Sequence, residues 1–285
     1  MALKADTEQI AWGRTIPFVL MHAACLPLFW CGVSRLAVGL CLFNYLLRMF
    51  GITAGYHRYF SHRSFKTSRP FQFVLAWLGA CSAQLGPLWW AAHHRHHHQH
   101  SDTHKDAHTP GLKGFLWAHM GWIFCPDYQV THYDRIRDFC RYPELLFLER
   151  NWLLPPTLMA VSTLVWGWWL GQFFPEWGTN GLQLLTWGFF VSTLLVYHAT
   201  FCINSMAHLW GTRRYPTKDD SRNNWVLALI TLGEGWHNNH HQYPSSERQG
   251  FYWWEVDMTH YGLTLLAALG LVWDLRTPPK GATPL

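Results

Sequence analysis

The sequence predicts an all-α integral membrane protein with four transmembrane helices in two hairpins and a cytoplasmic helical cap. Three observations support this. Stretches without Asp, Glu, Lys or Arg occur at 15–34, 151–175 and 177–212, and about 20 such residues let an α-helix cross a membrane. Nearly all of the 22 Lys and Arg residues lie outside the short turns of the expected hairpins. Many of the 19 Trp residues stand near the ends of the uncharged stretches, which is typical of membrane interfaces.

The hydrophobic pattern predicts where the chain crosses. Of the Lys and Arg residues, only Arg35 falls in the two turns that join the crossings. Positive charge favours the cytoplasmic side, so both ends of the chain and its histidine-rich segments are expected there. The chain is interpreted as a single domain. The four crossings are expected at about 15–33, 36–56, 152–172 and 181–203, the cap at 57–150 and 204–275, and a disordered tail at 276–285.

Other apolar segments are not expected to cross. The block 71–92 is long enough, but one crossing there would put the histidines before and after it on opposite sides of the membrane. It is therefore expected to lie in the interface or to dip and return. The run 223–233 is too short to span, and 258–273 is placed at the cytoplasmic face. Arg48 would be costly within the hydrocarbon, so 36–47 is expected to lie deepest.

Histidines form three clusters whose spacing indicates metal binding. In two distant segments they stand at positions i, i+3 and i+4, which share one face of an α-helix. In the first cluster the spacing is i, i+5, about 140° apart on a regular helix, which requires a helix end, a loop or two different metals. An adventitious metal-binding surface would show irregular spacing in one tract. The clusters are His57 and His62; His94, His97 and His98; and His237, His240 and His241.

A ninth histidine extends this set. Asn204 and His208 are spaced i, i+4 where the fourth crossing ends, so both can point at one site. Nine imidazoles are too many for one tetrahedral or octahedral ion and suit two, so the cap is expected to hold a histidine-rich dimetal site. Zinc cannot cycle electrons, iron can, and copper remains chemically possible. No pair of the seven Cys has CxxC spacing, so no thiolate zinc site is indicated.

The remaining histidines are interpreted as supporting or structural residues. Three acidic residues, Asp102, Asp106 and Glu234, are candidates to orient the ligand imidazoles. Histidines beside the second cluster are expected to support the ligands or face solvent: His93, His96, His100, His104 and His108. Isolated histidines are expected to be structural: His22, His119, His132, His198 and His260.

The chain resembles a known family at several motifs. The three clusters match its HxxxxH, HxxHH and HxxHH boxes, and the flanking residues of the following segments match as well: 51–58, 62–66, 204–208, 233–241 and 270–274. These segments resemble the membrane fatty acyl desaturases of the stearoyl-CoA (delta-9) type, in particular bacterial members. The resemblance covers most of residues 36–275. It implies a four-span helical fold, two iron ions and a tunnel for an acyl chain.

The resemblance also implies residue roles. The eight cluster histidines and His208 would ligate two iron ions, and Asn204 would hold a metal-bound water. The reaction would be O2-dependent formation of a cis double bond in a saturated acyl chain, with two electrons from a ferredoxin or cytochrome. No side-chain acid or base beyond the metal ligands is expected to be catalytic. The implied location is a bacterial inner membrane with a cytoplasmic site, and no nucleic-acid partner is expected.

The acyl carrier and the tunnel are less determined. Animal acyl-CoA desaturases have basic residues where this chain has Ala92 and the segment after Trp122, which favours acyl-phospholipid or acyl-carrier protein but leaves acyl-CoA open. Cys41 and Tyr45, one helical turn apart, are expected to help close the tunnel or simply to pack against a neighbouring helix. Two other functions stay open: a membrane di-iron fatty acyl or alkyl hydroxylase, and a non-enzymatic metal-binding protein or transporter.

Overall fold

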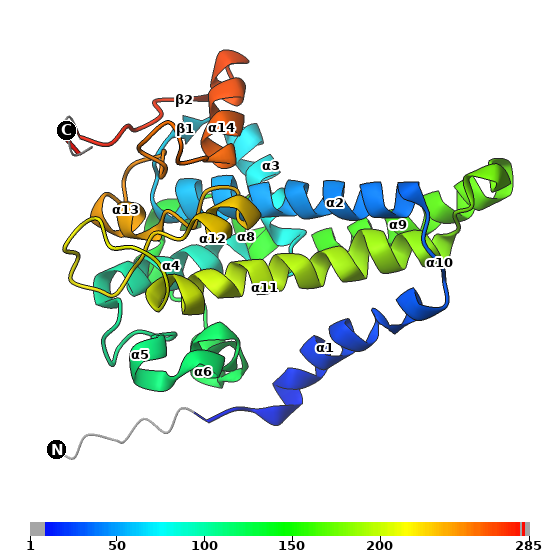
Figure 1. Ribbon diagram of the computed structural model, residues 1–285, viewed down its shortest axis with the longest axis horizontal. Helices are drawn as coiled ribbons and strands as arrows, with labels where there is room; N and C mark the ends of the chain where they lie inside the picture. The colour runs from blue at the N-terminus through cyan, green and yellow to red at the C-terminus, as the bar shows by residue number, and fades with distance from the viewer. Residues whose placement is uncertain (1–8, 280, 283–285) are drawn as a thin grey trace.

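The computed structural model describes residues 9–279, 281 and 282, and it is almost entirely helical (Figure 1). Two short antiparallel strands, β1 (Lys66–Thr67) and β2 (Val272–Trp273), form the one ladder among these residues. The α-helices are α1 (Trp12–Ala23), α2 (Arg35–Phe50), α3 (Arg69–Ala80), α4 (Pro87–His100), α5 (Pro110–Lys113), α6 (Phe115–His119), α7 (Arg137–Cys140), α8 (Pro143–Arg150), α9 (Leu154–Phe173), α10 (Gly181–Leu184), α11 (Ser192–Ser205), α12 (Trp225–Ile230), α13 (His237–Gln242) and α14 (Met258–Ala268).

Wider and tighter helical turns interrupt or join these helices. Two π-helices continue long rods without a break: η2 follows α2 directly, and η7 connects α10 to α11. The π-helices are η2 (Gly51–Ser61) and η7 (Leu185–Val191). The 3-10 helices are η1 (Leu26–Phe29), η3 (Gly121–Phe124), η4 (Pro126–Gln129), η5 (Tyr133–Arg135), η6 (Pro175–Trp177) and η8 (Met206–His208).

Two rods are long and apolar enough to cross a membrane by length and composition. They are Arg35–Ser61 and Gly181–His208, of 27 and 28 residues. They lie side by side along the long axis of the molecule as α2 and α11 (Figure 1). A third candidate is the pair α8 and α9, which bends by 68°. The second and fourth expected crossings thus fall within long helices, and the third corresponds to α9.

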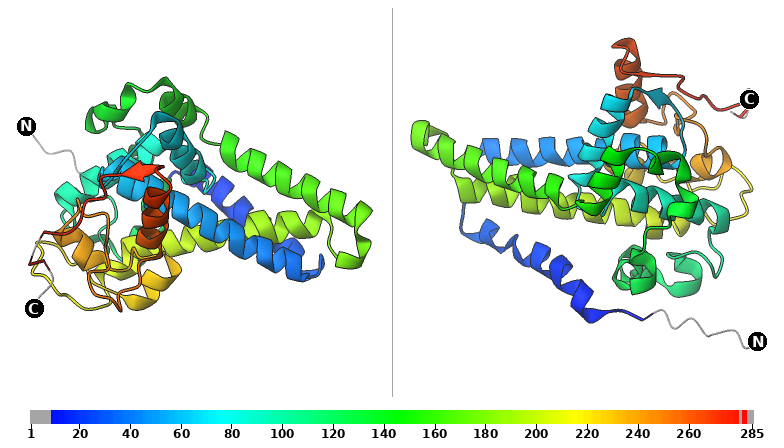
Figure 2. Two further views of the ribbon diagram at one scale, coloured as in Figure 1. Left: turned by 90° about the horizontal axis from the view of Figure 1, so that it is seen from above. Right: turned by 180° about the vertical axis from the view of Figure 1, so that it is seen from behind.

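The first expected crossing, 15–33, differs from a regular span. It contains most of α1 and then η1, so it is not one continuous helix. Pro17 lies within α1 and Pro27 opens η1, and proline lacks the N–H that helix continuation requires. At twelve residues, α1 reaches only about 18 Å. The right-hand view of Figure 2 shows α1 set at an angle to the long rods.

The block 71–92 does not form a single spanning helix. It breaks between α3 and α4, where Ala83 and Leu85 adopt φ values of 56° and 63°. Such left-handed backbone conformations end a helix. The expectation that this block does not cross once agrees with that break. The turn carries α4, with its histidines, back towards η2.

The short runs in the cap are also short helices. The run 223–233 contains α12, and 258–273 contains α14 followed by β2. Arg276, where the expected tail begins, exchanges backbone hydrogen bonds with Ser64 and Glu247, and the expected disorder of the residues after it stays a prediction. Residues 280 and 283–285 of that tail lie outside the described residues.

Arg48 is fully buried near the end of α2. Its Nε donates to the Asn44 carbonyl at 3.0 Å, and its two terminal nitrogens donate to the hydroxyls of Thr193 and Ser192 on α11. A buried cation needs such partners. The guanidinium therefore ties the two long rods together at this level.

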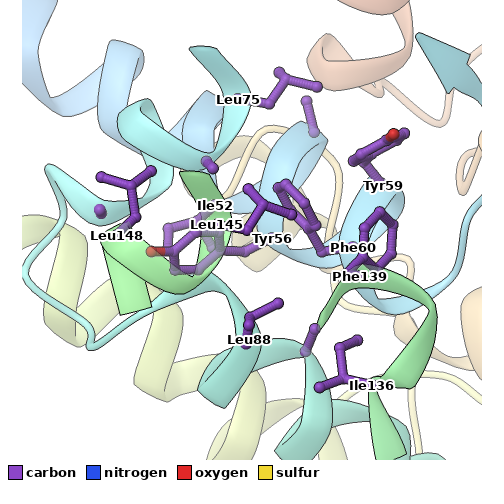
Figure 3. Close-up of a cluster of buried hydrophobic side chains, with 14 of the residues drawn as sticks. Ile52, Tyr56, Tyr59, Phe60, Leu75, Leu88, Ile136, Phe139, Leu145 and Leu148 are labelled. Atoms are coloured by element: carbon purple, nitrogen blue, oxygen red, sulfur yellow. The ribbon is translucent and has the colours of Figure 1, made fainter. Parts of the chain in front are cut away.

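The main hydrophobic core holds the histidine-bearing helices against one another (Figure 3). Tyr56 and Phe60 of η2 pack with Leu75 of α3, Leu88 of α4 and Leu145 of α8. All five side chains are fully buried. Apolar burial is the main driving force for such packing. It holds η2 against α4, the two helices that carry the first two histidine clusters.

A second anchor is polar. The fully buried Arg58 guanidinium pairs with Glu234 at 3.0 Å and Asp257 at 2.9 Å, and lies 3.6 Å from Glu247. These carboxylates come from the loop before α13 and from the segment around α14. A buried charge network of this kind is stable only when its partners are all present. It joins η2 to the part of the cap that carries the third cluster.

Candidate metal centre

The first cluster is brought together by the π-helix η2. His62 N donates to the His57 carbonyl at 3.2 Å, an i→i+5 bond. This wider turn brings residues five apart close to one face, and the two imidazole centroids lie 4.8 Å apart. The expected helix end is confirmed, because His62 is the C-cap residue of η2; the sequence analysis did not specify that this end is π-helical. His57 and His62 belong to one site.

The nine predicted ligands converge in two groups. The first, here called the five-histidine group, contains His57, His62, His94, His98 and His240. The second, here called the four-histidine group, contains His97, His208, His237 and His241. Within each group the nitrogens lie within 4.8 Å of one another. Every predicted histidine ligand is thus in a cluster able to hold an ion.

The two helical triplets do not each face one site, as their spacing suggested. On α4, His94 and His98 join the five-histidine group and His97 joins the other. On α13 the assignment is reversed: His240 crosses to the five-histidine group, while His237 and His241 stay in the four-histidine group. In both helices the i, i+4 pair stays together and the i+3 residue faces the second group.

In the five-histidine group the Nε2 atoms form a chain of close contacts. His62 and His94 are 2.9 Å apart, His94 and His98 3.0 Å, His98 and His240 2.9 Å, and His240 and His57 3.0 Å. With an imidazole–metal bond of about 2.1 Å, neighbouring ligands at right angles on one ion are about 3 Å apart. The spacing is therefore that of imidazoles around a shared cation.

Three members of the four-histidine group are oriented by carboxylates. His208 Nδ1 donates to Asp102 at 2.8 Å and His97 Nδ1 to Asp106 at 3.1 Å. His241 Nδ1 donates to Asp219 at 2.8 Å. Donation from Nδ1 leaves the Nε2 lone pair free for a metal. In its neutral form, each of these three imidazoles therefore presents an unprotonated Nε2 to its neighbours.

The five-histidine group has one such partner. Glu234 pairs with His57 Nδ1 and also accepts from Arg58 and from Gln249. Asp102, Asp106 and Glu234 were predicted to orient ligands, and each contacts one. Asp219 was missed, because it stands in an exposed polar loop between α11 and α12 with no motif around it; only the fold brings it to His241.

Burial keeps most ligand imidazoles neutral. Burial, with the neighbouring histidines, lowers the pKa of His62, His94 and His98 well below the ordinary value of 6.5. Burial also lowers the pKa of His241 to about 4, although Asp219 opposes the shift. Metal binding requires the neutral imidazole. These groups therefore need no deprotonation near neutral pH to bind an ion.

His97 behaves differently from these imidazoles. Burial acts to lower its pKa, but the Asp106 carboxylate outweighs burial and raises the pKa overall. The Glu234 carboxyl is fully buried, which acts to raise its pKa, yet the adjacent His57 and Arg58 hold it at about 2. A carboxylate that stays ionised is the better hydrogen-bond acceptor for a ligand imidazole.

Buried nitrogens without partners complete the test for a metal. Among the described residues, His241 Nε2, His237 Nδ1 and His240 Nδ1 are buried and make no hydrogen bond. An unpaired buried polar atom is costly. A cation coordinated by His241 Nε2 would remove that cost for this one of the three nitrogens. The chemistry and spacing of both groups fit metal ions. All-imidazole sets suit iron as well as zinc and copper.

A cavity of about 440 Å³ lies beside the five-histidine group. Aromatic side chains line much of it, including Trp89, Trp90 and Trp122, and His94 and Asn204 also lie on its wall. Such largely apolar cavities with a few polar groups are typical of ligand sites. Asn204 is thus at the cavity, while His208, its predicted neighbour, lies in the four-histidine group.

The other predicted cavity residues are elsewhere. Cys41 is buried in α2 and Tyr45 donates its hydroxyl to the Ile230 carbonyl. Neither lines the 440 Å³ cavity. A role for them in closing an acyl tunnel stays a prediction. Instead, Gln84 Nε2 donates to Thr200 Oγ1 at 3.2 Å across the lining of the cavity, a pair that the sequence analysis did not single out.

Histidines outside the nine also have defined partners. His93 and His96 contact the carbonyls of Val130 and Lys105, which agrees with a supporting or surface role. His108 lies with His97 and Asp106 in a third potential ligand set. The isolated His22, His198 and His119 form a chain of side-chain contacts at 3.2 and 3.1 Å, as expected for structural residues.

Comparisons with known proteins agree with this site. The family model "Fatty acid desaturase" matches residues 34–273. The chain is 36% identical to the sn-2 palmitoyl-lipid 9-desaturase of Nostoc sp. (strain 36), over 98% of this chain and 95% of that protein. It is also 36% identical to the sn-1 stearoyl-lipid 9-desaturase of Anabaena variabilis, over 98% and 99%.

A plant relative has a different substrate in its name. The acyl-CoA C20 Delta5-desaturase of Anemone leveillei is 36% identical over 81% of this chain and 71% of its own. Desaturation is common to these relatives, whereas the carrier and the bond position vary. From the histidine groups, the family match and the near-complete coverage, the chain belongs to the fatty acid desaturase family and is an acyl desaturase.

Proposed function

We propose that this desaturase introduces a cis double bond at carbon nine of a saturated acyl chain carried by a membrane glycerolipid, using two iron ions, O2 and external electrons. The observation that carries the proposal is the cavity whose aromatic wall includes His94 and Asn204. The cyanobacterial relatives, which align over nearly the full length of the chain, support the bond position and the lipid carrier.

Each histidine group would hold one iron ion. The five-histidine and four-histidine groups provide five and four imidazoles. Iron bound there supplies the redox chemistry that activates O2 and removes two hydrogens from unactivated methylenes, which no side chain can do. Asn204, on the cavity wall, would hold a metal-bound water.

The protein's own contribution is to hold and orient. Asp102, Asp106, Asp219 and Glu234 keep the ligand imidazoles turned towards their group. The cavity wall positions one pair of methylenes beside His94. When the reacting groups are already held in one geometry, little further entropy is lost on the way to the transition state. The apolar wall also keeps water away from the reacting carbons.

Four crossings with a cytoplasmic cap are part of the proposal. The two long rods and the bent pair α8–α9 provide three of the crossings by length and composition. The fourth would be formed by α1 and η1 together, packed beside the rods. The charge distribution supports a cytoplasmic cap, where a soluble electron donor such as a ferredoxin or cytochrome could reach the metal centre. The bacterial inner membrane is the proposed location.

The carrier proposal rests on a local difference. The positions where animal acyl-CoA desaturases have basic residues hold Ala92, which is fully buried, and the apolar turn after Trp122. These residues offer no charge to the phosphates of CoA. A lipid-bound chain would reach the cavity from within the membrane and would not need them.

The test is fatty-acid analysis of a desaturase-deficient host. We would express the chain or its His97→Ala variant and determine double-bond positions by gas chromatography and mass spectrometry after derivatisation. New cis-monoenes with the bond at carbon nine, formed by the intact chain alone and first in the glycerolipid fraction, are expected. Hydroxylated products would replace the proposal with a hydroxylase, and monoenes first in the acyl-CoA pool would refute the lipid carrier.

A further inference from the structure

One wall of the cavity is formed by the exposed helix α1. None of its residues is buried, yet it contributes several residues to the cavity lining. Its opposite surface is apolar and exposed, with Val19 and Leu20 at 58% and 60%. An exposed apolar surface of this kind suits contact with lipid. The lining residues from α1 are Gly13, Arg14, Pro17, Phe18 and Met21.

A few polar contacts connect α1 to the rest of the protein. At its beginning, Ala11 N donates to the Phe124 carbonyl at 3.2 Å. Towards its end, His22 Nε2 contacts His198 Nε2 at 3.2 Å. Between these points the helix stands at an angle to the long rods (Figure 1). The cavity therefore has a wall that faces lipid directly on its other side.

Among the residues that the structure describes, Arg14 is the only Arg or Lys on the cavity wall. Its side chain is exposed, and Nη1 donates to the neutral Gln129 Oε1 at 2.6 Å. Within the part of the chain that the structure describes, Arg14 takes part in no ion pair, whereas Arg63, Arg69 and Arg95 all do. Its guanidinium thus keeps donors available for an anion.

The surroundings of Arg14 place it at the level of lipid head groups. Trp12, two residues earlier, is 75% exposed, and exposed Trp residues concentrate at the membrane–water interface. The first turn of α1 contains no acidic residue and no side-chain cap. The positive end of the helix dipole therefore adds to the charge of Arg14.

We propose that Arg14 binds the phosphate of a membrane phospholipid whose acyl chain lies along α1 and reaches His94 and Asn204. The inference rests on the proposed function, which it deepens by assigning the head group of the substrate. A guanidinium binds a phosphate through two parallel hydrogen bonds. The acyl chain would then follow the apolar inner face of α1, past Phe18, into the cavity.

Binding can be measured without turnover. The full-length metal-loaded protein would be kept in neutral detergent without an electron donor and titrated with phosphatidylglycerol carrying a cis-parinaroyl chain. Energy transfer from the cavity tryptophans reports occupancy. The matching diacylglycerol with the same chain but no phosphate is the second probe, and parinaroyl-CoA is the third.

The expected result separates charge from shape. Arg14→Gln should weaken phosphatidylglycerol binding about tenfold, the size of one lost charge-assisted pair, and leave diacylglycerol binding unchanged. Arg14→Lys should recover part of the loss. Arg35→Gln is the matched control, because Arg35 is also exposed at the beginning of an apolar helix but does not line this cavity.

Three results would overturn the inference. Unchanged phosphatidylglycerol binding would remove Arg14 from the site, and equal losses for both lipids would mean that it only shapes the cavity. An effect confined to parinaroyl-CoA would assign the phosphate to a soluble thioester. The proposed function is judged separately by monoene formation: Arg14-dependent binding without monoenes would refute that function alone, and monoenes without Arg14-dependent binding would refute this inference alone.

Discussion

The two histidine groups differ in how their ligands are held. The five-histidine group has more imidazoles but only one paired with a carboxylate, through Glu234. The four-histidine group has fewer imidazoles, and three are paired with Asp102, Asp106 and Asp219. Carboxylate partners make a ligating imidazole more basic and hold its orientation. The five-histidine group therefore relies on the number of its ligands, and the four-histidine group on oriented, electron-rich ligands.

The largest expected effect is loss of a ligand. His98→Ala in the five-histidine group and His237→Ala in the four-histidine group should each remove one of the two proposed iron ions and lower desaturation at least ~100-fold, since even outer partners of a ligand contribute 10–100-fold. Plasma emission spectrometry would measure the iron bound per protein molecule, and the yield of monoenes would measure desaturation. The control is His96→Ala, because His96 lies on α4 with His98 but belongs to neither histidine group. Retention of both irons in either variant would contradict the assignment.

A smaller effect should distinguish the groups directly. Asp219→Asn should weaken iron binding in the four-histidine group by ~10–100-fold. Glu234→Gln should weaken the other group less, because four of its five imidazoles have no carboxylate partner. Loss of iron to a chelator would be followed over time. Asp220→Asn serves as control, because the Asp220 side chain contacts Arg213 and no ligand. Equal losses of iron from the two variants would show that the two groups do not differ in their dependence on carboxylate partners.

The metal-free protein should become less stable as pH falls below 6.5. His98 is held neutral when folded, its pKa lowered by burial and then by neighbouring imidazoles. The unfolded state therefore binds more protons below 6.5, which costs about 1.4 kcal/mol of unfolding free energy per pH unit for such a group. Thermal unfolding followed by tryptophan fluorescence at pH 7.5 and 5.5 would measure the difference.

Substitutions in the two groups should change the pH dependence of thermal stability in opposite directions. His98→Asn should reduce the acid sensitivity. His97 has a raised pKa, despite burial, because of Asp106, so its contribution is fully present below 6.5 and is lost as pH rises through its folded pKa. His97→Asn should therefore destabilise the protein more at pH 5.5 than at 7.5. The same pH response in both variants would be inconsistent with the different environments.

The smallest effect is expected away from both groups. Replacing Cys41 and Tyr45 together by Ala should leave the preferred chain length unchanged, because neither lines the cavity beside His94. Thr200→Ala, which removes the contact with Gln84 on the cavity wall, should alter the product distribution. Gas chromatography of host fatty acids compares the two. A changed preference for acyl-chain length in the Cys41 and Tyr45 variant would instead support the predicted role of these residues in closing the tunnel.

Much of the site could be predicted from local spacing. The three clusters and His208 identified all nine histidines that converge, and Asp102, Asp106 and Glu234 were correctly expected beside them. The division between the two groups could not be predicted. On an α-helix, i+3 and i+4 lie on either side of the direction of residue i. Whether His97 faces one group or the other depends on which helices pack there, and this is set by contacts distant in sequence.

The amino-acid sequence was enough to predict a membrane protein with a histidine-rich metal site, because uncharged stretches and repeated histidine spacing are local properties with one dominant physical interpretation. The tertiary structure decided the rest. The π-helix that aligns His57 with His62, the arrival of Asp219 at His241 and the cavity under α1 all depend on packing between distant segments. The energy of such packing is shared among many contacts, such as the core around Phe60 and the Arg58 network, and no short segment of sequence contains it.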